Sequence, residues 1–229
     1  GLLDIFLHGA QIFHTSNQIH RRPKRARCTA TIHDMTVWKM PELHTKGNIR
    51  ADKHFAEEIL KRVDRLITVS ENSRKDAIQI LDLKPESVRC IYPGVPRAYF
   101  TAGPSEIEQM RAQLQINRPY VLYVGTIEPR KNLERLLDSW ATLPRDIHDE
   151  YELILAGPAG WSSDATQSRL SNGGARSCHS NIRYLGYVPE SLLPGLTAGA
   201  TVLAYPSLYE GFGFPAAQAL AAGVPVLTS

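Results

Sequence analysis

The sequence is poor in cysteine, and its other absences exclude several classes of protein. Its three cysteines, Cys28, Cys90 and Cys178, are far apart and form no Cys-x-x-Cys pair. This usage predicts reduced structural thiols in a cytoplasmic protein, and it disfavours a disulfide framework or a zinc site. No apolar run approaches the roughly 18 residues that a membrane span needs. Residues 1–6 carry Asp4 inside an apolar run and have no basic lead-in, so they are not typical of a signal peptide.

Three catalytic motifs are also missing. The chain contains no Asp-x-Asp, no Gly-x-Ser-x-Gly and no His/Cys cluster with metal-ligand spacing. These absences disfavour a metal–diphosphate bridge, a serine-hydrolase elbow and a structural metal centre. We therefore predict no metal site.

Positive charge is concentrated in the first half of the chain. Residues 1–100 hold 17 Lys and Arg against 11 Asp and Glu, whereas residues 101–229 hold 9 against 12. Such an excess attracts nucleic acid, an anionic membrane surface or an acidic acceptor. Pro23 interrupts the densest run and no aromatic residue is interleaved, which disfavours nucleic acid. A solvated loop is the main interpretation of this run, and an anionic membrane surface or acceptor is the alternative. Its cations are Arg21, Arg22, Lys24, Arg25 and Arg27.

Short apolar runs alternate with amphipathic segments along the whole chain. Nearly continuous apolar runs are typical of strands buried on both faces. Their alternation with helical segments predicts an α/β fold with parallel sheets covered by helices on both faces. The predicted strands are residues 10–14, 28–32, 66–69, 88–92, 120–124, 152–156, 182–185, 201–205 and 224–227; the predicted helices include residues 51–65, 70–81, 105–115 and 133–140.

A break rich in proline and glycine at residues 93–104 separates two sets of strands and helices. Each set is complete on its own side of the break, which is typical of an interdomain hinge. We therefore predict two domains, residues 1–102 and 103–229.

Residues 120–137 carry the best local motif, YVLYVGTIEPRKNLERLL. A buried strand ends at Gly125, a turn follows, and Arg130 and Lys131 stand where we expect a helix to begin. The carboxyl edge of a parallel sheet is where such folds bind ligands, and a helix start favours an anion. The two cations therefore suit a phosphate, although this is no Walker loop because Arg130 replaces its glycine.

Residues 205–215 form a second strand–loop–helix motif, YPSLYEGFGFP. Gly211 and Gly213 allow backbone N–H groups to approach an anion, and Pro215 fits the first turn of a helix. Glu210 is placed to accept hydrogen bonds from sugar hydroxyls. Gly211-x-Gly213-x-x-Ala216 also matches a loose dinucleotide fingerprint, so a dinucleotide-dependent oxidoreductase remains an alternative.

A third motif, Thr31–Asp34, places His33 at the end of a predicted strand. A histidine there can hydrogen-bond a sugar or assist proton transfer. A lone His-Asp pair is more often structural, so His33 is a candidate only in combination with the other two motifs.

Taken together, these segments resemble glycosyltransferase family 4, whose members are retaining enzymes of the GT-B fold, with two Rossmann-like lobes facing a cleft. The nearest resemblance is to bacterial mannosyl- or rhamnosyltransferases that build surface polysaccharide. The matching stretches occur in the family's order; they are TIHD (31–34), LITVS (66–70), YPGV (92–95), VGTIEPRKNL (124–133), LAGPAGW (155–161), LGYVP (185–189) and YPSLYEGFGFPAAQALAAGVPVLTS (205–229).

The resemblance implies a set of site residues and partners. The donor is a GDP- or UDP-sugar used as substrate, with no permanently bound cofactor, and the acceptor is a glycan or a lipid-linked sugar. The location implied is the cytoplasm or the inner face of the membrane. The implied roles are diphosphate neutralisation by Lys131 with Arg130, a backbone cradle for the donor from Gly211, Phe212, Gly213 and Phe214, sugar binding by Glu210, base contact by Val188, and His33 facing the donor sugar.

Two departures from the family pattern bear on donor affinity. Gln218 replaces the second acid of the Glu-x7-Glu signature, so a charge-assisted bond to the ribose becomes a neutral bond of roughly half the strength. Thr126 replaces an arginine that many members carry after the glycine, and Arg130 is the candidate substitute. We also expect the chain to be truncated at both ends, with a partial first lobe and without the last helices of the second. An inactive nucleotide-sugar-binding fragment or scaffold is therefore the alternative function.

Overall fold

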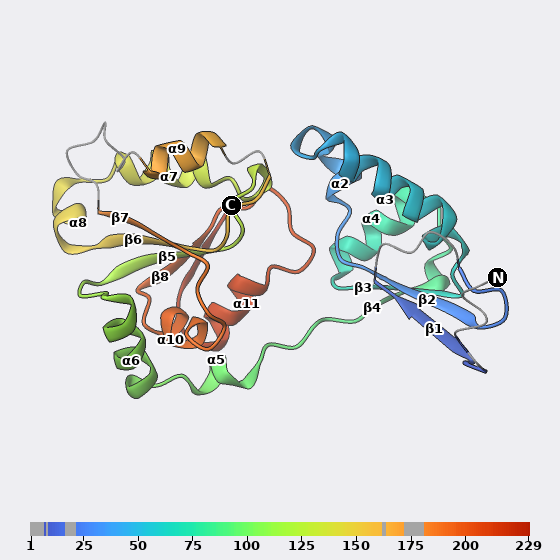
Figure 1. Ribbon diagram of the computed structural model, residues 1–229, viewed down its shortest axis with the longest axis horizontal. Coiled ribbons are helices and arrows are strands. Elements are labelled where there is room, and N and C mark those ends of the chain that lie inside the picture. The colour runs from blue at the N-terminus through green and yellow to red at the C-terminus, as the bar shows by residue number, and fades with distance from the viewer. Residues whose placement is uncertain (1–6, 8, 17–21, 162–163, 172–180) are drawn as a thin grey trace. The chain divides into compact units, whose positions relative to one another are not determined.

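The computed structural model describes residues 7, 9–16, 22–161, 164–171 and 181–229. Residues 1–6, Arg21 and Cys178, which were interpreted above from the sequence, lie outside these ranges. Of the three cysteines, Cys28 and Cys90 are described, and both are free thiols. The chain divides into two compact units, Gly1–Gly94 with Glu210–Phe212, and Val95–Tyr209 with Gly213–Ser229 (Figure 1). No helix in the described ranges is long and apolar enough to cross a membrane.

The first unit contains a four-stranded parallel sheet. Its strands follow chain order, β1 (Ile12–Thr15), β2 (Arg27–Ile32), β3 (Arg65–Thr68) and β4 (Val88–Cys90). Its helices are α2 (Thr36–Lys39), α3 (Lys46–Glu58) and α4 (Glu71–Leu81), with the 3₁₀ turns η1 (Pro41–Leu43), η2 (Leu60–Arg62) and η3 (Pro85–Ser87).

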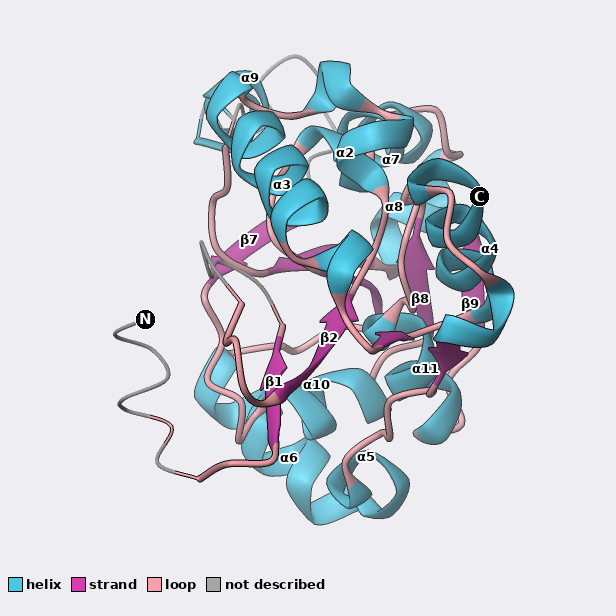
Figure 2. Cartoon of the chain, turned by 90° about the vertical axis from the view of Figure 1, so that its right-hand side faces the viewer, coloured by secondary structure: helices cyan, strands magenta, loops and turns pink. Residues whose placement is uncertain are grey.

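Local caps and apolar packing explain where these helices lie. The Ser70 hydroxyl accepts a hydrogen bond from the Ser73 N–H at 3.0 Å and so caps α4. Thr45 caps α3 in the same way. The two helices bury their apolar faces on β2 and β3, and α3 can be followed along one side of this sheet in Figure 2. The core includes Ala30, Ile32, Phe55, Ala56, Ile59, Leu66, Ala77, Leu81 and Val88.

The second unit contains a five-stranded parallel sheet in the order β7-β6-β5-β8-β9. Its strands are β5 (Tyr120–Val124), β6 (Glu152–Ala156), β7 (Ile182–Gly186), β8 (Val202–Tyr205) and β9 (Val226–Thr228). Its helices are α5 (Arg97–Thr101), α6 (Pro104–Leu114), α7 (Leu133–Ala141), α8 (Arg145–Glu150), α9 (Asp164–Ser171), α10 (Leu193–Ala198) and α11 (Phe214–Ala221), with the 3₁₀ turn η4 (Pro129–Lys131).

Apolar layers cover both faces of this second sheet. One layer joins the sheet to α6, α10 and α11, and the other joins it to α7. The phenol of Tyr120 lies in the first layer and donates to the Leu196 carbonyl at 2.7 Å. Burial raises the pKa of Tyr120, which keeps this donor neutral. The strand order reverses between β5 and β8, as in a doubly wound dinucleotide-binding sheet.

The α/β fold with two parallel-sheet units is confirmed, and all nine predicted strands are present. The division between the units falls inside the predicted break, at Gly94–Val95. The prediction of a helix over residues 51–65 was wrong at both ends, because α3 begins at Lys46 and ends at Glu58. The backbone leaves the helical region at Ile59 (φ −120°, ψ −63°), and the following residues form η2.

Candidate functional site

Two of the predicted motifs meet at one edge of the second sheet. The motif at 120–137 contributes the loop after β5, and the motif at 205–215 contributes the loop after β8. These two strands are neighbours and parallel, and the strand order reverses between them. A ligand crevice in such a sheet lies outside the carboxyl ends of the strands at this reversal. The topology therefore brings both loops to the place where a doubly wound sheet binds its ligand.

Lys131 is the central cation of this edge. It is the only lysine in residues 85–229 of the sequence, and only 9% of it is exposed. Its ammonium donates to the hydroxyl of Tyr205, with Nζ 3.2 Å from Oη, and Nζ lies 5.3 Å from the centroid of the same ring. Desolvating an ammonium is costly without such partners. Tyr205, at the end of β8, therefore holds this charge at the site.

The sequence predicted that Arg130 and Lys131 stand at the start of an α-helix, but the structure places them before it. They belong to the 3₁₀ turn η4, and Asn132 then takes the left-handed conformation (φ 56°) before α7 begins at Leu133. An asparagine tolerates this conformation better than most residues. Asn132 interrupts an otherwise helical pattern, so Lys131 lies two residues and Arg130 three residues before the first residue of α7.

Arg130 is engaged within the protein. Its guanidinium donates to the Glu128 carboxylate at 2.5 Å and to the Tyr209 carbonyl at 2.9 Å. Its own carbonyl accepts from the Leu208 N–H at 2.9 Å. The sequence motif contains both Arg130 and Glu128, but it gave no sign of the contact with Tyr209, which lies 79 positions farther along the chain.

The other donor-side residues keep their predicted elements. Gly213 (φ 84°) caps α11, which has Pro215 in its first turn and carries the half-buried Gln218. Thr126 follows β5, and its carbonyl accepts from the Tyr123 hydroxyl at 3.3 Å. Val188 is buried in the core beside β7. Glu210, Gly211 and Phe212 group with the first unit.

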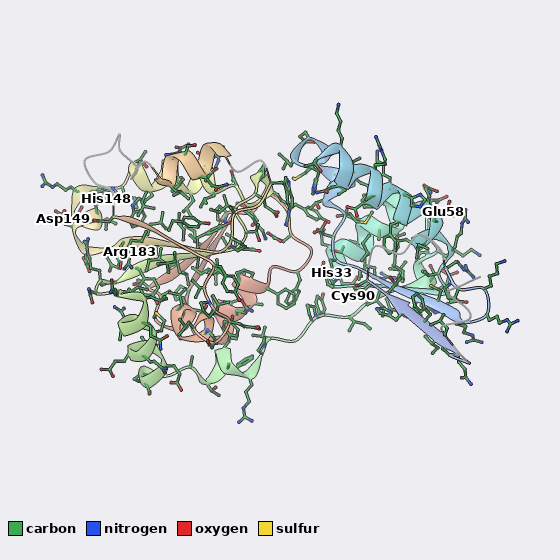
Figure 3. The ribbon with its side chains drawn as sticks, viewed as in Figure 1. His33, Glu58, Cys90, His148, Asp149 and Arg183 are labelled. Atoms are coloured by element: carbon green, nitrogen blue, oxygen red, sulfur yellow. The ribbon has the colours of Figure 1, made fainter. Side chains whose placement is uncertain are left out.

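His33 follows β2 in the first unit, where its side chain is exposed (Figure 3). It borders a cavity of about 140 Å³ that also contains Asp34, Trp38, Asp52 and Phe55 in its wall. Asp34 accepts hydrogen bonds from the N–H and the hydroxyl of Thr36 and so fixes the turn into α2. Burial, and then the charge of Asp34, raise the pKa of Asp52. The sequence did not single out either Asp52, which lies in a predicted helix, or Trp38, which lies outside every motif.

The described residues contain no group of three His, Cys, Asp or Glu side chains arranged to hold a metal ion. Figure 3 also labels His148 and Asp149 in the second unit. Both precede β6, so they lie at the opposite end of the sheet from the Lys131 loop.

The tie between Lys131 and Tyr205 makes a testable contribution to stability. We expect Tyr205→Phe to lower the free energy of unfolding by about 1 kcal/mol, because it removes the hydroxyl that accepts from a buried ammonium. The ring and its contact with Nζ remain in this variant. Urea unfolding followed by tryptophan fluorescence measures the difference. Tyr187→Phe is the matched control, because Tyr187 is 73% exposed; equal midpoints for the two variants would contradict the assignment.

The family models agree with this division of the chain. Residues 106–229 match the model of glycosyl transferases group 1, and residues 3–99 match the model of glycosyltransferase family 4. The chain belongs to the glycosyl transferases group 1 family. The resemblance found in the sequence motifs is thereby confirmed.

Two bacterial sugar transferases are similar to this group 1 chain. O-antigen chain mannosyltransferase B of Escherichia coli is 35% identical over 204 residues, which cover 89% of this chain and 53% of that protein. A D-inositol 3-phosphate glycosyltransferase of Mycolicibacterium gilvum is 26% identical over 208 residues, 84% of this chain and 46% of the relative. The chain thus spans about half the length of these two relatives.

Solved structures share the fold of this group 1 chain. Anabaena Alr3699/HepE, in complex with UDP and glucose, superposes with a TM-score of 0.68 at 24% identity, over 89% of this chain and 53% of that one. WaaG, a glycosyltransferase involved in lipopolysaccharide biosynthesis, gives a TM-score of 0.77 at 20% identity, over 99% and 62%. At these identities the likeness establishes the GT-B fold alone.

Proposed function

We propose that this chain is part of a retaining glycosyltransferase that moves a hexose from a nucleoside-diphosphate sugar to a hydroxyl acceptor. The observation that carries the proposal is the buried ammonium of Lys131, on the loop after β5, which donates to Tyr205 at the end of β8. A diphosphate carries the opposite charge and suits this place in a doubly wound sheet. Mannose is the first candidate for the sugar, because the Escherichia coli relative is named a mannosyltransferase.

The chain's own residues would divide the work on the donor. Lys131 would neutralise charge on the departing diphosphate, an electrostatic contribution that grows as the sugar bond breaks. Glu210 would accept hydrogen bonds from the hydroxyls of the transferred sugar, and Gln218 from the ribose. The remaining assignments are the backbone of Gly211, Phe212, Gly213 and Phe214 around the donor, Val188 at the base and Thr126 beside the phosphates.

The proposed reaction needs no covalent intermediate with the protein. The bond from the anomeric carbon to the phosphate oxygen breaks, and the acceptor oxygen bonds to that carbon on the same face. The departing phosphate takes the acceptor's proton, so charge and atoms balance. The protein contributes orientation and charge stabilisation.

Residues of the first unit are candidates for the sugar and the acceptor. His33 is assigned to the donor sugar by the family resemblance. The cavity beside it combines an aromatic ring, Trp38, with the carboxylate of Asp52, and pockets with an apolar wall and a few polar groups are typical of small-ligand sites. A glycan or lipid-linked acceptor fits this chemistry.

The basic run of the first unit supports a place at an anionic membrane surface. Its described cations, Arg22, Lys24, Arg25 and Arg27, are all exposed. Each exposed cation close to an anionic membrane surface contributes about 1 kcal/mol of attraction. Peripheral attachment would bring the enzyme to a lipid-linked acceptor.

Calorimetric titration of the purified chain with UDP and with GDP tests the donor site. We expect micromolar affinity for at least one of the two. Lys131 and the loop after β8 would engage the diphosphate that both share, and the base would decide between them. The nucleotide that binds more tightly identifies the base. Absence of binding by both would overturn the proposed donor site, and binding of a reduced nicotinamide cofactor, seen by its fluorescence, would favour the oxidoreductase instead.

A further inference from the structure

The guanidinium of Arg130 fastens two loops of the second unit to each other. It joins Glu128, on the loop after β5, to the carbonyl of Tyr209, on the loop after β8. The Leu208 N–H adds a second link by donating to the Arg130 carbonyl. We propose that Arg130 is a positioning residue that holds the loop after β8 in place for the donor, and that it is not itself a phosphate ligand. This inference rests on the proposed function.

The burial of the ion pair supports this division of roles. The side chain of Arg130 is 12% exposed and that of Glu128 is 4% exposed. Removing one partner of a buried pair leaves an uncompensated charge, which is strongly unfavourable. A phosphate that drew the guanidinium away would therefore strand the Glu128 carboxylate next to an anionic ligand.

The charges of the loop lead to the same conclusion. Glu128 neutralises Arg130, so Lys131 supplies the net positive charge of the segment 128–131. The planar guanidinium also suits a bridge between a carboxylate and a carbonyl, because its N–H donors are fixed in a fork. Tyr209 immediately precedes Glu210 in the chain, so the bridge restrains the backbone directly before the proposed sugar-binding carboxylate.

The alternative is that Arg130 replaces the arginine missing at Thr126 and binds phosphate. The two ideas differ most clearly in the protein without nucleotide. A positioning residue restrains the loop in the empty protein, whereas a phosphate ligand acts only when the donor is present. Glu128→Gln, combined with loss of Arg130, distinguishes the two roles further. It removes the carboxylate that would otherwise be left without its partner, so it should relieve the loss of a positioning residue but not the loss of a phosphate ligand.

Amide hydrogen exchange of the chain without nucleotide is the first measurement. In Arg130→Met we expect exchange in the segment 206–212 to rise about 10-fold, the factor that corresponds to losing a hydrogen bond from a charged donor. Arg130→Lys keeps the charge but cannot form both links, so an intermediate rise is expected. Arg135→Met is the matched control, because Arg135 is an exposed cation on α7. Exchange equal to that of the unaltered chain in both Arg130 variants would overturn the proposal.

Calorimetry with UDP and GDP is the second measurement. We expect Arg130→Met to weaken binding about 10-fold, and the double variant Glu128→Gln with Arg130→Met to recover part of that loss. A loss of affinity with unchanged loop exchange and no recovery would identify Arg130 as a phosphate ligand and overturn the positioning role. If the unaltered chain binds neither nucleotide, the proposed function fails, while the exchange measurement still decides whether Arg130 restrains the loop.

Discussion

Replacing Lys131 by methionine should reduce sugar transfer by about 10²–10³-fold, the effect of removing one preorganised electrostatic donor. Methionine retains much of the buried aliphatic stem but cannot neutralise a departing diphosphate. The expected loss is large because the ammonium is buried, where water screens its charge poorly. Release of nucleoside diphosphate from a nucleotide-sugar donor in the presence of acceptor measures the rate, and calorimetry with UDP and GDP measures the accompanying loss of affinity.

The control for this experiment is Arg135→Met, which removes a cation from the exposed side of α7 one turn farther along the chain. It should leave the rate and the affinity within a factor of about two, because exposed charges are well screened. Circular dichroism of Lys131→Met should show an intact fold, with a urea midpoint close to that of Tyr205→Phe, which loses the same hydrogen bond. Turnover close to that of the unaltered chain in Lys131→Met would remove this residue from the proposed mechanism.

The elements of the fold were predictable wherever a local pattern determines them. The apolar runs at 120–124 and 152–156 give β5 and β6 within their observed bounds, because both strands are buried on both faces and leave no alternation to misread. Ser70 marks the start of α4 through its own hydroxyl. Helix α3 was misjudged because Ile59, Leu60 and Val63 continue the apolar spacing past Glu58, where the backbone has already left the helix.

The site was predictable in its loops but not in its pairings. Two strand–loop–helix motifs identified Lys131 and Glu210, because a parallel sheet places the carboxyl ends of its strands at one edge. The strand order that makes β5 and β8 neighbours is a long-range property, and neither motif predicts it. The contacts of Arg130 with Tyr209 and of Lys131 with Tyr205 depend on that order. The left-handed conformation of Asn132, which separates η4 from α7, was also not predicted, because the surrounding residues fit a helical pattern.

Gly157→Ala should destabilise the second unit by about 3 kcal/mol or more, which places it among the most severe single substitutions in this chain. Gly157 follows β6 with a φ of +142°, and a Cβ built there would lie 2.1 Å from the carbonyl oxygen of Gly125. The neighbouring atom is backbone, so no side chain can turn aside to relieve the clash. Hydrogen bonds hold Gly157 from the other side, since its N–H donates to the Gly186 carbonyl at 2.7 Å and its carbonyl accepts from the Tyr184 hydroxyl at 3.0 Å.

Gly186→Ala is the control that distinguishes the steric clash at Gly157 from the cost of placing an alanine at a positive φ. Gly186 also has a positive φ (+65°), but a Cβ there would meet nothing within 4 Å, so we expect a loss of only about 1 kcal/mol. Urea unfolding followed by the fluorescence of Trp140, which is buried in the second unit, measures both variants. Equal losses would show that the approach of Gly157 to Gly125 is not a close backbone contact. Because Gly125 begins the loop that carries Lys131, Gly157→Ala should also weaken binding of UDP and GDP in whatever fraction remains folded, whereas Gly186→Ala should not.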